Sequence, residues 1–214
     1  MLARELELLG PANQTYISVP EVSNKTIIDK TLNDLDKKFS FKNIPIEQHC
    51  LPNMDWLPKM HKTPIKARFI VAAPKCSVKP LSKAITKIFK MFLNKIEAYN
   101  EKSRFFSGVN TFWVVQSNKQ VTKSLRQLNK YGKARSISTF DFSTLYTNIP
   151  HDKLLEVLNS IIDFCFQGTD KKLINVTTWG ASFVQKCLNK TCFSKQKVKD
   201  AVKYLLSHCF FYSW

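Results

Sequence analysis

Glycine and long apolar runs are both scarce in this sequence. Only five of the 214 residues are glycine, so a glycine-rich loop that cradles phosphate groups is not expected. No run of apolar residues reaches membrane-spanning length, and the first residues do not resemble a signal peptide. These absences favour an intracellular protein, nuclear or cytoplasmic, with no membrane partner.

Acidic residues are nearly missing from the middle of the chain. Residues 59–135 hold eighteen Lys and Arg but only two acids, Glu97 and Glu101, and they carry nearly all of the net charge of +17. Such a local excess suits a polyanion, and nucleic acid is the commonest polyanion that proteins meet. The alternative is a solvated lysine-rich face that only aids solubility.

The six cysteines contain no C-x-x-C pair. Cys187 and Cys192, with His208 and Cys209 downstream, allow a zinc site, but their spacing is looser than that of the common zinc motifs. We therefore expect buried free thiols rather than a metal site.

Hydrophobic periodicity predicts a helix-rich α+β protein. Six helices are expected, at residues 24–40, 81–99, 116–129, 152–166, 178–191 and 195–209. Extended segments are expected at residues 56–60 and 68–72, which form a hairpin around a Thr-Pro turn, at 111–115, and at 136–142. The expected helix at 116–129 places Val121, Leu125 and Leu128 inward, and the one at 152–166 is apolar nearly all round, which predicts burial.

Three lysines lie off the apolar stripe of the expected helix at 81–99. Lys83, Lys87 and Lys90 form either a face that contacts nucleic-acid phosphates or plain solvated surface. The sequence leaves both interpretations open.

The segment T-F-D-F-S-T-L-Y-T-N-I-P-H at residues 139–151 is the most informative in the chain. It places Asp141 between Phe140 and Phe142 on the expected strand, with both rings packed on helices such as 152–166 and the carboxylate on the other face. An ionised carboxylate among apolar residues is costly unless a cation or hydrogen-bond donor meets it. A bound metal ion is one explanation, and a cap on the turn before the next helix is the other.

The F-D-F-S-T-L-Y segment resembles the first catalytic motif of reverse transcriptases, specifically those of Penelope-like retroelements. Upstream, W-L-P-K-M-H-K-T-P followed by R-F-I-V resembles the fingers region of that family, and K-P-L-S-K and R-F-F-S-G-V-N follow in the same order. The similarity covers residues 50–166 well. It implies right-hand polymerase-like fingers and an incomplete palm with a short antiparallel sheet.

The resemblance also implies roles for individual residues. Asp141 would be the first catalytic, metal-binding aspartate for Mg²⁺, with the backbone carbonyl of Phe142 near the metal. Tyr146 would be the aromatic gate beneath the sugar of the incoming dNTP, and Arg68 and Lys66 would reach its triphosphate. Template phosphate would meet Lys59 and Lys62, and the wider partners would be an RNA template and a DNA primer.

No Asp-Asp pair occurs anywhere in the sequence, although the family carries its other catalytic carboxylates in such a pair. Two-metal nucleotidyl transfer requires more than one positioned carboxylate. The sequence therefore predicts an N-terminal part of an RNA-directed DNA polymerase that is inactive alone. It would comprise an extension (1–50), a basic fingers-like region (51–135) and a partial palm (136–214). The alternative is a non-catalytic basic domain that binds nucleic acid.

Overall fold

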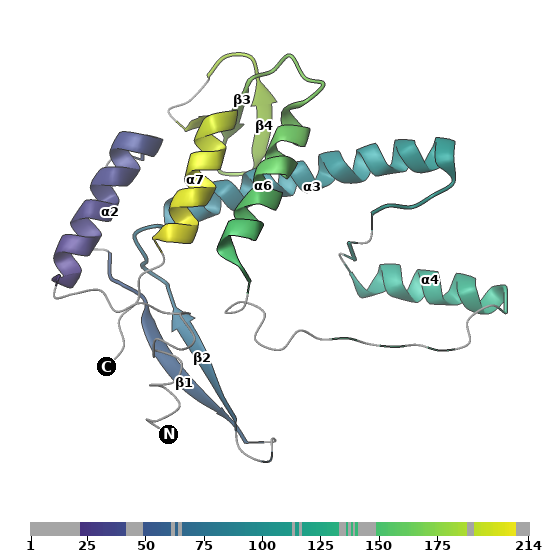
Figure 1. The fold of residues 1–214 in the computed structure, drawn as a ribbon, viewed down its shortest axis with the longest axis horizontal. Coiled ribbons are helices and arrows are strands. Elements are labelled where there is room, and N and C mark those ends of the chain that lie inside the picture. Colours follow the sequence, from purple (N-terminus) through teal and green to yellow (C-terminus); the bar gives the residue numbers. More distant parts are fainter. Residues whose placement is uncertain are drawn as a thin grey trace. The chain divides into compact units, whose positions relative to one another are not determined.

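The chain forms two compact units, residues 1–93 with 150–214, and residues 94–149. The computed structural model describes residues 22–41, 49–60, 63, 66–112, 114–115, 117–132, 136, 138, 140, 149–187 and 191–208. Within these residues the protein has five helices and two small antiparallel sheets, which confirms the α+β prediction (Figure 1). The domain boundaries expected from the sequence stay predictions.

Most elements belong to the first unit, and α3 runs on into the second, which also contains α4. The element bounds in chain order are α2 (Asn24–Phe39), β1 (Asn53–Lys59), β2 (Lys66–Ala72), α3 (Lys79–Ser107), α4 (Asn118–Lys130), α6 (His151–Phe166), β3 (Leu173–Val176), β4 (Ala181–Val184), β5 (Cys192–Ser194) and α7 (Lys195–Ser207).

Strands β1 and β2 form the hairpin that the sequence predicts. They pair antiparallel from Asn53 opposite Ala72 to Lys59 opposite Lys66. The first strand begins earlier than expected and includes Pro58. Proline is tolerated there because each strand of a two-stranded sheet has one edge that needs no hydrogen-bonded neighbour.

The second sheet replaces the helix expected at residues 178–191, so that prediction is wrong. Strand β3 lies in the middle of the order β4-β3-β5, and both pairings are antiparallel. The β3–β4 turn is closed by Thr177, whose backbone N–H donates to the Gly180 carbonyl (2.8 Å) and whose hydroxyl oxygen accepts from the Gly180 N–H (3.2 Å). These local hydrogen bonds satisfy backbone groups of the hairpin turn. They therefore offer this segment an alternative to the hydrogen bonds of a helix.

The same sheet brings Cys187 and Cys192 together in a disulfide with a Cα–Cα distance of 5.9 Å. Because Cys192 begins β5 and Cys187 follows β4, the pairing of both strands with β3 sets this proximity. The expectation of buried thiols outside any disulfide is therefore wrong for this pair and confirmed for Cys165, which is buried. Cys50 is also outside the disulfide but is exposed. Neither bonded sulfur is available to a zinc ion.

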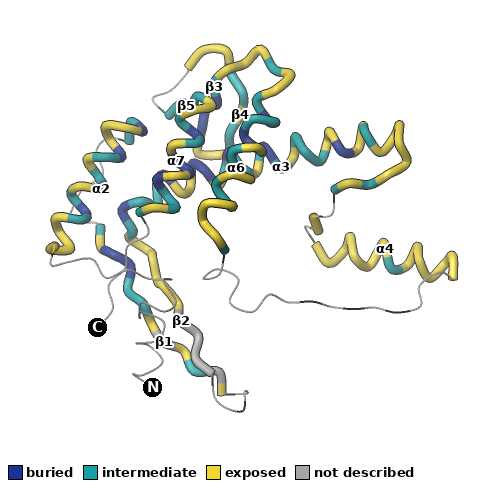
Figure 2. The backbone as a smooth tube through the Cα atoms, in the orientation of Figure 1, coloured by how far each residue is buried: buried dark blue, intermediate teal, exposed yellow. Residues whose placement is uncertain are grey.

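An aromatic cluster forms the core between α3, α6 and β4. Phe92 is 1% exposed, and its ring centroid lies 5.7, 6.1 and 6.2 Å from those of Phe89, Phe166 and Phe183. The Phe166 and Phe183 rings meet edge to face at 5.1 Å. Figure 2 shows most of the buried residues of α3 on the part of the helix near β3, β4 and α6, whereas the buried Asn100 lies farther along the helix. The burial expected for α6 is only partly confirmed, since Ile162 and Cys165 are its buried residues.

Helix α2 packs against α7 through Tyr204. The Phe39 and Tyr204 rings meet edge to face at 5.7 Å, and the Tyr204 hydroxyl donates to the Asp34 carboxylate at 3.5 Å. The ammonium of Lys38 lies 5.4 Å from the Tyr204 ring centroid, and His208 stacks on the ring at 3.8 Å. One aromatic side chain thus joins α2 to α7.

Burial and the nearby Asp34 carboxylate raise the pKa of the Tyr204 hydroxyl from 10.0 to about 12. A raised pKa means that the folded chain holds this proton more tightly than the unfolded chain. The associated stabilisation is therefore present below pH 10.0 and is lost as the pH rises through about 12.

We expect the free energy of unfolding to fall more steeply between about pH 10 and about pH 12 in the wild type than in Tyr204→Phe. Urea unfolding of the two proteins across this range measures the difference. If the free energy of unfolding fell equally with pH in both proteins, the raised pKa of Tyr204 would be contradicted.

In the second unit, Asn100, Gly108, Asn110 and Thr111 form a group of hydrogen bonds at the end of α3. Gly108 adopts φ +72°, the left-handed conformation that commonly ends helices, and its N–H donates to the Arg104 carbonyl at 2.8 Å. The buried Asn100 side chain then donates to Asn110 Oδ1 (2.9 Å) and accepts from the Thr111 N–H (2.9 Å). These residues lie within the C-terminal half of the chain's basic middle segment, and the hydrogen bonds use no charged side chain.

Helix α4 differs from its prediction in what it buries. Its bounds match the expectation closely, but it has no buried residue, and Val121 and Leu128 are 43% and 45% exposed. The prediction that these residues point into a core is therefore wrong. Residues 111, 112, 114 and 115 also form no strand.

The strand expected at 136–142 is not seen at the three of its residues that the structure describes. Ser136, Ser138 and Phe140 lie outside any helix or strand, and Phe140 is 94% exposed. The prediction that this ring is buried is wrong. A strand needs a neighbouring strand to satisfy its backbone groups. Among the described residues, the two sheets consist of β1 and β2, and of β3, β4 and β5, and neither includes a strand from this segment.

Candidate nucleic-acid interface

The hairpin places three of the predicted nucleic-acid and nucleotide contacts on one face of its ladder. Lys59 and Lys66 are directly opposed in register, and Arg68 stands two positions along β2 from Lys66. Opposed positions share a face, as do positions two apart along a strand. The register therefore places these three basic positions on the same side of the ladder.

The lysines expected to line α3 divide into two kinds. Lys83 and Lys90 are exposed, as a phosphate-binding residue must be. Lys87 instead crosses to the β3–β4 turn, where its ammonium donates to the carbonyls of Thr177 (2.7 Å) and Thr178 (2.9 Å). An ammonium has three donors, so two of the three are used within the fold.

Replacing Lys87 with Met should lower the free energy of unfolding by about 1–2 kcal/mol, because two turn carbonyls lose a charged donor. Chemical denaturation measures the loss. Lys90→Met on the same helix is the matched control, and it should change stability by less than about 0.5 kcal/mol. Equal effects in the two variants would show that the Lys87 bonds do not stabilise the turn.

Four of the predicted site residues lie outside the described part of the chain. This holds for Asp141, Phe142 and Tyr146, and also for Lys62. Among the described residues, no group of three or more His, Cys, Asp and Glu could hold a metal ion. The Mg²⁺ assignment therefore stays a prediction that rests on the sequence motif.

An ion-pair cluster that the sequence did not reveal joins α6 to α7. Asp163 lies 2.7 Å from the Lys199 ammonium and 3.2 Å from that of Lys195. Hydrogen bonds from Lys199 and then Lys195 lower the pKa of Asp163. This carboxylate is therefore a structural partner of two lysines and not a free metal ligand.

Sequence reasoning also overlooked the basic residues of α4. Lys119, Lys123, Arg126 and Lys130 recur at intervals of four, three and four residues, and all are exposed. The signal was readable, because this interval places side chains on one face of a helix. These four basic residues lie on the face opposite Val121 and Leu128.

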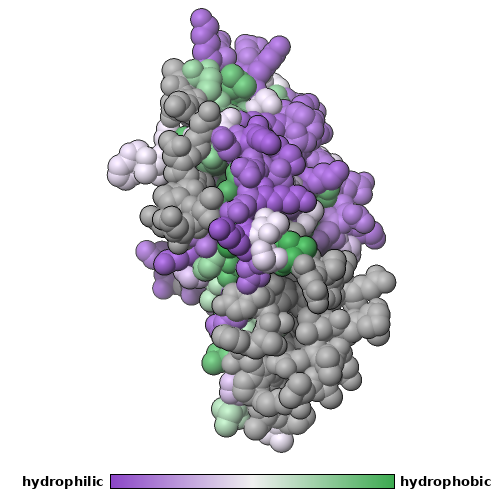
Figure 3. Space-filling model, turned by 90° about the vertical axis from the view of Figure 1, so that its left-hand side faces the viewer, coloured by the Kyte–Doolittle hydropathy of each residue, from purple (hydrophilic) through white to green (hydrophobic). Residues whose placement is uncertain are grey.

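Figure 3 shows that hydrophilic residues cover most of the described area on one face of the molecule, where hydrophobic residues form small separate groups. Scattered apolar residues of this kind are normal for a protein surface. Charged and polar chemistry therefore dominates what the described part of that face offers to a partner.

None of the helices in the described ranges is both long enough and apolar enough to cross a lipid bilayer. The disulfide is more usual in oxidising compartments than in the cytosol. The intracellular location stays a prediction.

Comparison with protein-family models, with curated proteins and with solved structures finds no match to this chain. The fold and the charged surfaces described above are therefore the only structural grounds for assigning a function.

Proposed function

We propose that this chain binds nucleic acid as the fingers and first part of the palm of an RNA-directed DNA polymerase of the reverse-transcriptase type. The observation that carries the proposal is the basic β1–β2 hairpin, in which Lys59, Lys66 and Arg68 share one face of the ladder. The W-L-P-K part of the first segment lies in β1, and the R-F-I-V segment lies in β2. A hairpin with this charge suits the phosphates of a template strand and of an incoming dNTP.

Each part of the proposal rests on ordinary phosphate chemistry. The planar fork of Arg68 matches the oxygens of a triphosphate, with Lys66 as a second positive charge for the same group. Lys59 and Lys62 act as point charges along the phosphate backbone of the template. Asp141 would hold Mg²⁺, and Tyr146 would discriminate between sugars. The exposed Lys83 and Lys90 add positive charge along α3.

The donor set in this chain does not fit a two-metal centre. A pair of Mg²⁺ ions needs several carboxylate oxygens, and the motif supplies only Asp141, while no Asp-Asp pair occurs in the sequence. We therefore assign no catalytic step to the chain alone and expect no primer extension from it.

The experiment is fluorescence anisotropy of the full chain with a labelled RNA-template–DNA-primer duplex. We expect binding that weakens steeply as salt increases, because each neutralised phosphate releases counterions. In the presence of Mg²⁺, the next complementary dNTP should tighten binding, and Arg68→Ala should abolish that gain. Lys25→Ala, which removes one exposed positive charge from α2, is the control and should preserve it.

The second candidate is a non-catalytic nucleic-acid-binding domain, which the exposed basic residues of α3 and α4 favour. It predicts the same salt dependence but no response to dNTP, and no effect of Asp141→Asn on binding of Mg²⁺. Absence of any binding to duplex or single strand at low salt would overturn both functions.

A further inference from the structure

Helix α4 carries a stripe of positive charge along one side. At about 100° per residue, Lys119, Lys123, Arg126 and Lys130 fall within about 60° of one another around the helix axis. The stripe is about 17 Å long at a rise of about 1.5 Å per residue. The helix contains no Asp or Glu, so nothing within it offsets these four charges.

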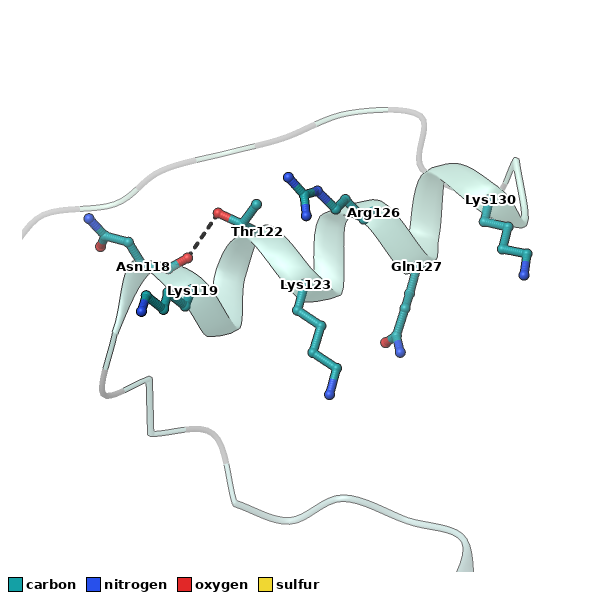
Figure 4. Close-up of a pocket in the computed structure, with 7 residues that line it drawn as sticks. All are labelled: Asn118, Lys119, Thr122, Lys123, Arg126, Gln127 and Lys130. Carbon is teal, nitrogen blue, oxygen red and sulfur yellow. Dashed lines mark hydrogen bonds between the residues drawn. The ribbon is translucent and has the colours of Figure 1, made fainter.

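The stripe is also free of ion pairs within the described residues. The salt bridges there join Lys38 to Asp34, and Lys195 and Lys199 to Asp163, and none involves α4. In Figure 4 the side chains of Lys119, Lys123 and Lys130 extend from the helix on the same side as Gln127. Together with Asn118, Thr122 and Arg126 they line a shallow open groove.

The chemistry of this groove fits phosphate groups in a row. Positive charges recur every 4.5–6 Å along the axis, by about 1.5 Å per residue, and a duplex of about 17 Å presents roughly ten phosphates. Asn118 and Gln127 add amide donors beside the charged groups, and such donors commonly contact phosphate and sugar. The described residues that line the groove include no aromatic side chain for stacking on bases and no carboxylate.

The apolar residues of α4 argue against a lipid surface as the partner. Val121, Leu125 and Leu128 lie about 180–240° around the axis from Lys119, on the side opposite the stripe. If this side entered a bilayer, the four positive charges would point away from the lipid headgroups. A polyanion on the stripe uses the charges directly and needs no apolar contact.

We infer that the basic stripe of α4, formed by Lys119, Lys123, Arg126 and Lys130, binds the phosphate backbone of duplex nucleic acid without reading its sequence. The inference rests on the proposed function, because it assumes that nucleic acid is the chain's partner. It adds a second binding surface in residues 94–149, on a different unit from the β1–β2 hairpin. Contacts to phosphate fix position on a duplex but carry no sequence information.

The test replaces all four residues with Gln and measures affinity for a labelled RNA–DNA duplex across a salt series. Gln keeps a helix propensity close to that of Lys and Arg, so α4 should persist, and circular dichroism checks this. Neutralising four phosphate contacts should reduce the slope of log K against log salt by about 3–4 and weaken binding more than tenfold at low salt.

A matched control removes the same charge elsewhere. Replacing the exposed Lys25, Lys30, Lys171 and Lys172 with Gln should leave the slope within about one unit of the wild type. A variant with Arg at 119, 123 and 130 keeps the charge and should keep wild-type binding. If the Gln variant loses helix, this Arg variant and single Gln substitutions, each expected to reduce the slope by about 1, decide the question.

Equal losses in the α4 and control variants would overturn the inference, since net charge alone would then explain binding. So would an unchanged slope in the α4 variant alongside a reduced slope in a Lys59/Lys66/Arg68→Gln variant, a result that would leave the proposed function intact. No binding by the wild type would overturn both. Loss of binding only to phosphatidylserine-containing vesicles, with duplex binding unchanged, would assign the stripe to a membrane instead.

Discussion

Phe92→Ala should lower the free energy of unfolding by about 3–5 kcal/mol, the largest effect expected for any single substitution in this chain. The Phe92 ring is 1% exposed and lies within 6.2 Å, centroid to centroid, of three other Phe rings. Truncation removes those contacts from α3, α6 and β4 at once and leaves a cavity that the rigid neighbours cannot close. In thermal unfolding the midpoint should fall by roughly 10 °C.

The same helix supplies the control. Phe105 is 84% exposed, and Phe105→Ala removes the same atoms from a ring that has little burial to lose. We expect a change within about 0.5 kcal/mol. Similar losses at positions 92 and 105 would mean that the aromatic cluster is not the core of the first unit.

Tyr204→Ala should lower the free energy of unfolding by about 3 kcal/mol or more and should weaken the packing of α2 on α7. Its ring contacts Phe39 and His208, and its hydroxyl donates to Asp34, so one truncation removes several contacts at the α2–α7 junction. Hydrogen exchange of amides in α2, from Asn24 to Phe39, should accelerate more than exchange in β3.

Tyr204→Phe keeps the ring and removes only a hydroxyl whose bond to Asp34 is long, at 3.5 Å. This variant should lower the free energy of unfolding by less than about 1 kcal/mol and should leave amide hydrogen exchange in α2 nearly unchanged. Uniform acceleration of exchange throughout the Ala variant would indicate global unfolding and would contradict a local role at the junction.

Local sequence signals predicted α2, α7 and the β1–β2 hairpin well. In each case the information lies within a few residues, such as the Ser23 side chain that accepts from the Thr26 N–H to begin α2, or the Ser194 side chain that accepts from the Lys197 N–H to begin α7. Helix caps and turns satisfy backbone groups locally, so the sequence reveals them.

Predictions from the sequence were wrong where contacts between residues distant in the chain determine the structure. Residues 178–191 hold apolar residues at helical spacing, yet β3 pairs with strands on both sides and draws Cys187 to Cys192. The periodicity of α4 was also real, but periodicity shows only that a helix has two faces, not that either is buried. On its apolar face Val121 and Leu128 are exposed, and no residue of the helix is buried.

The residues of the candidate site show the same difference between local signals and tertiary contacts. The sequence by itself determined the charge of the middle segment, the motif around Asp141 and the hairpin that carries Arg68, because composition and short spacings need no tertiary contact. Only the tertiary structure decided that Lys87 serves the β3–β4 turn whereas Lys83 and Lys90 are exposed. Three lysines on one helix are equivalent in sequence, and they differ only in what the fold places beside each ammonium.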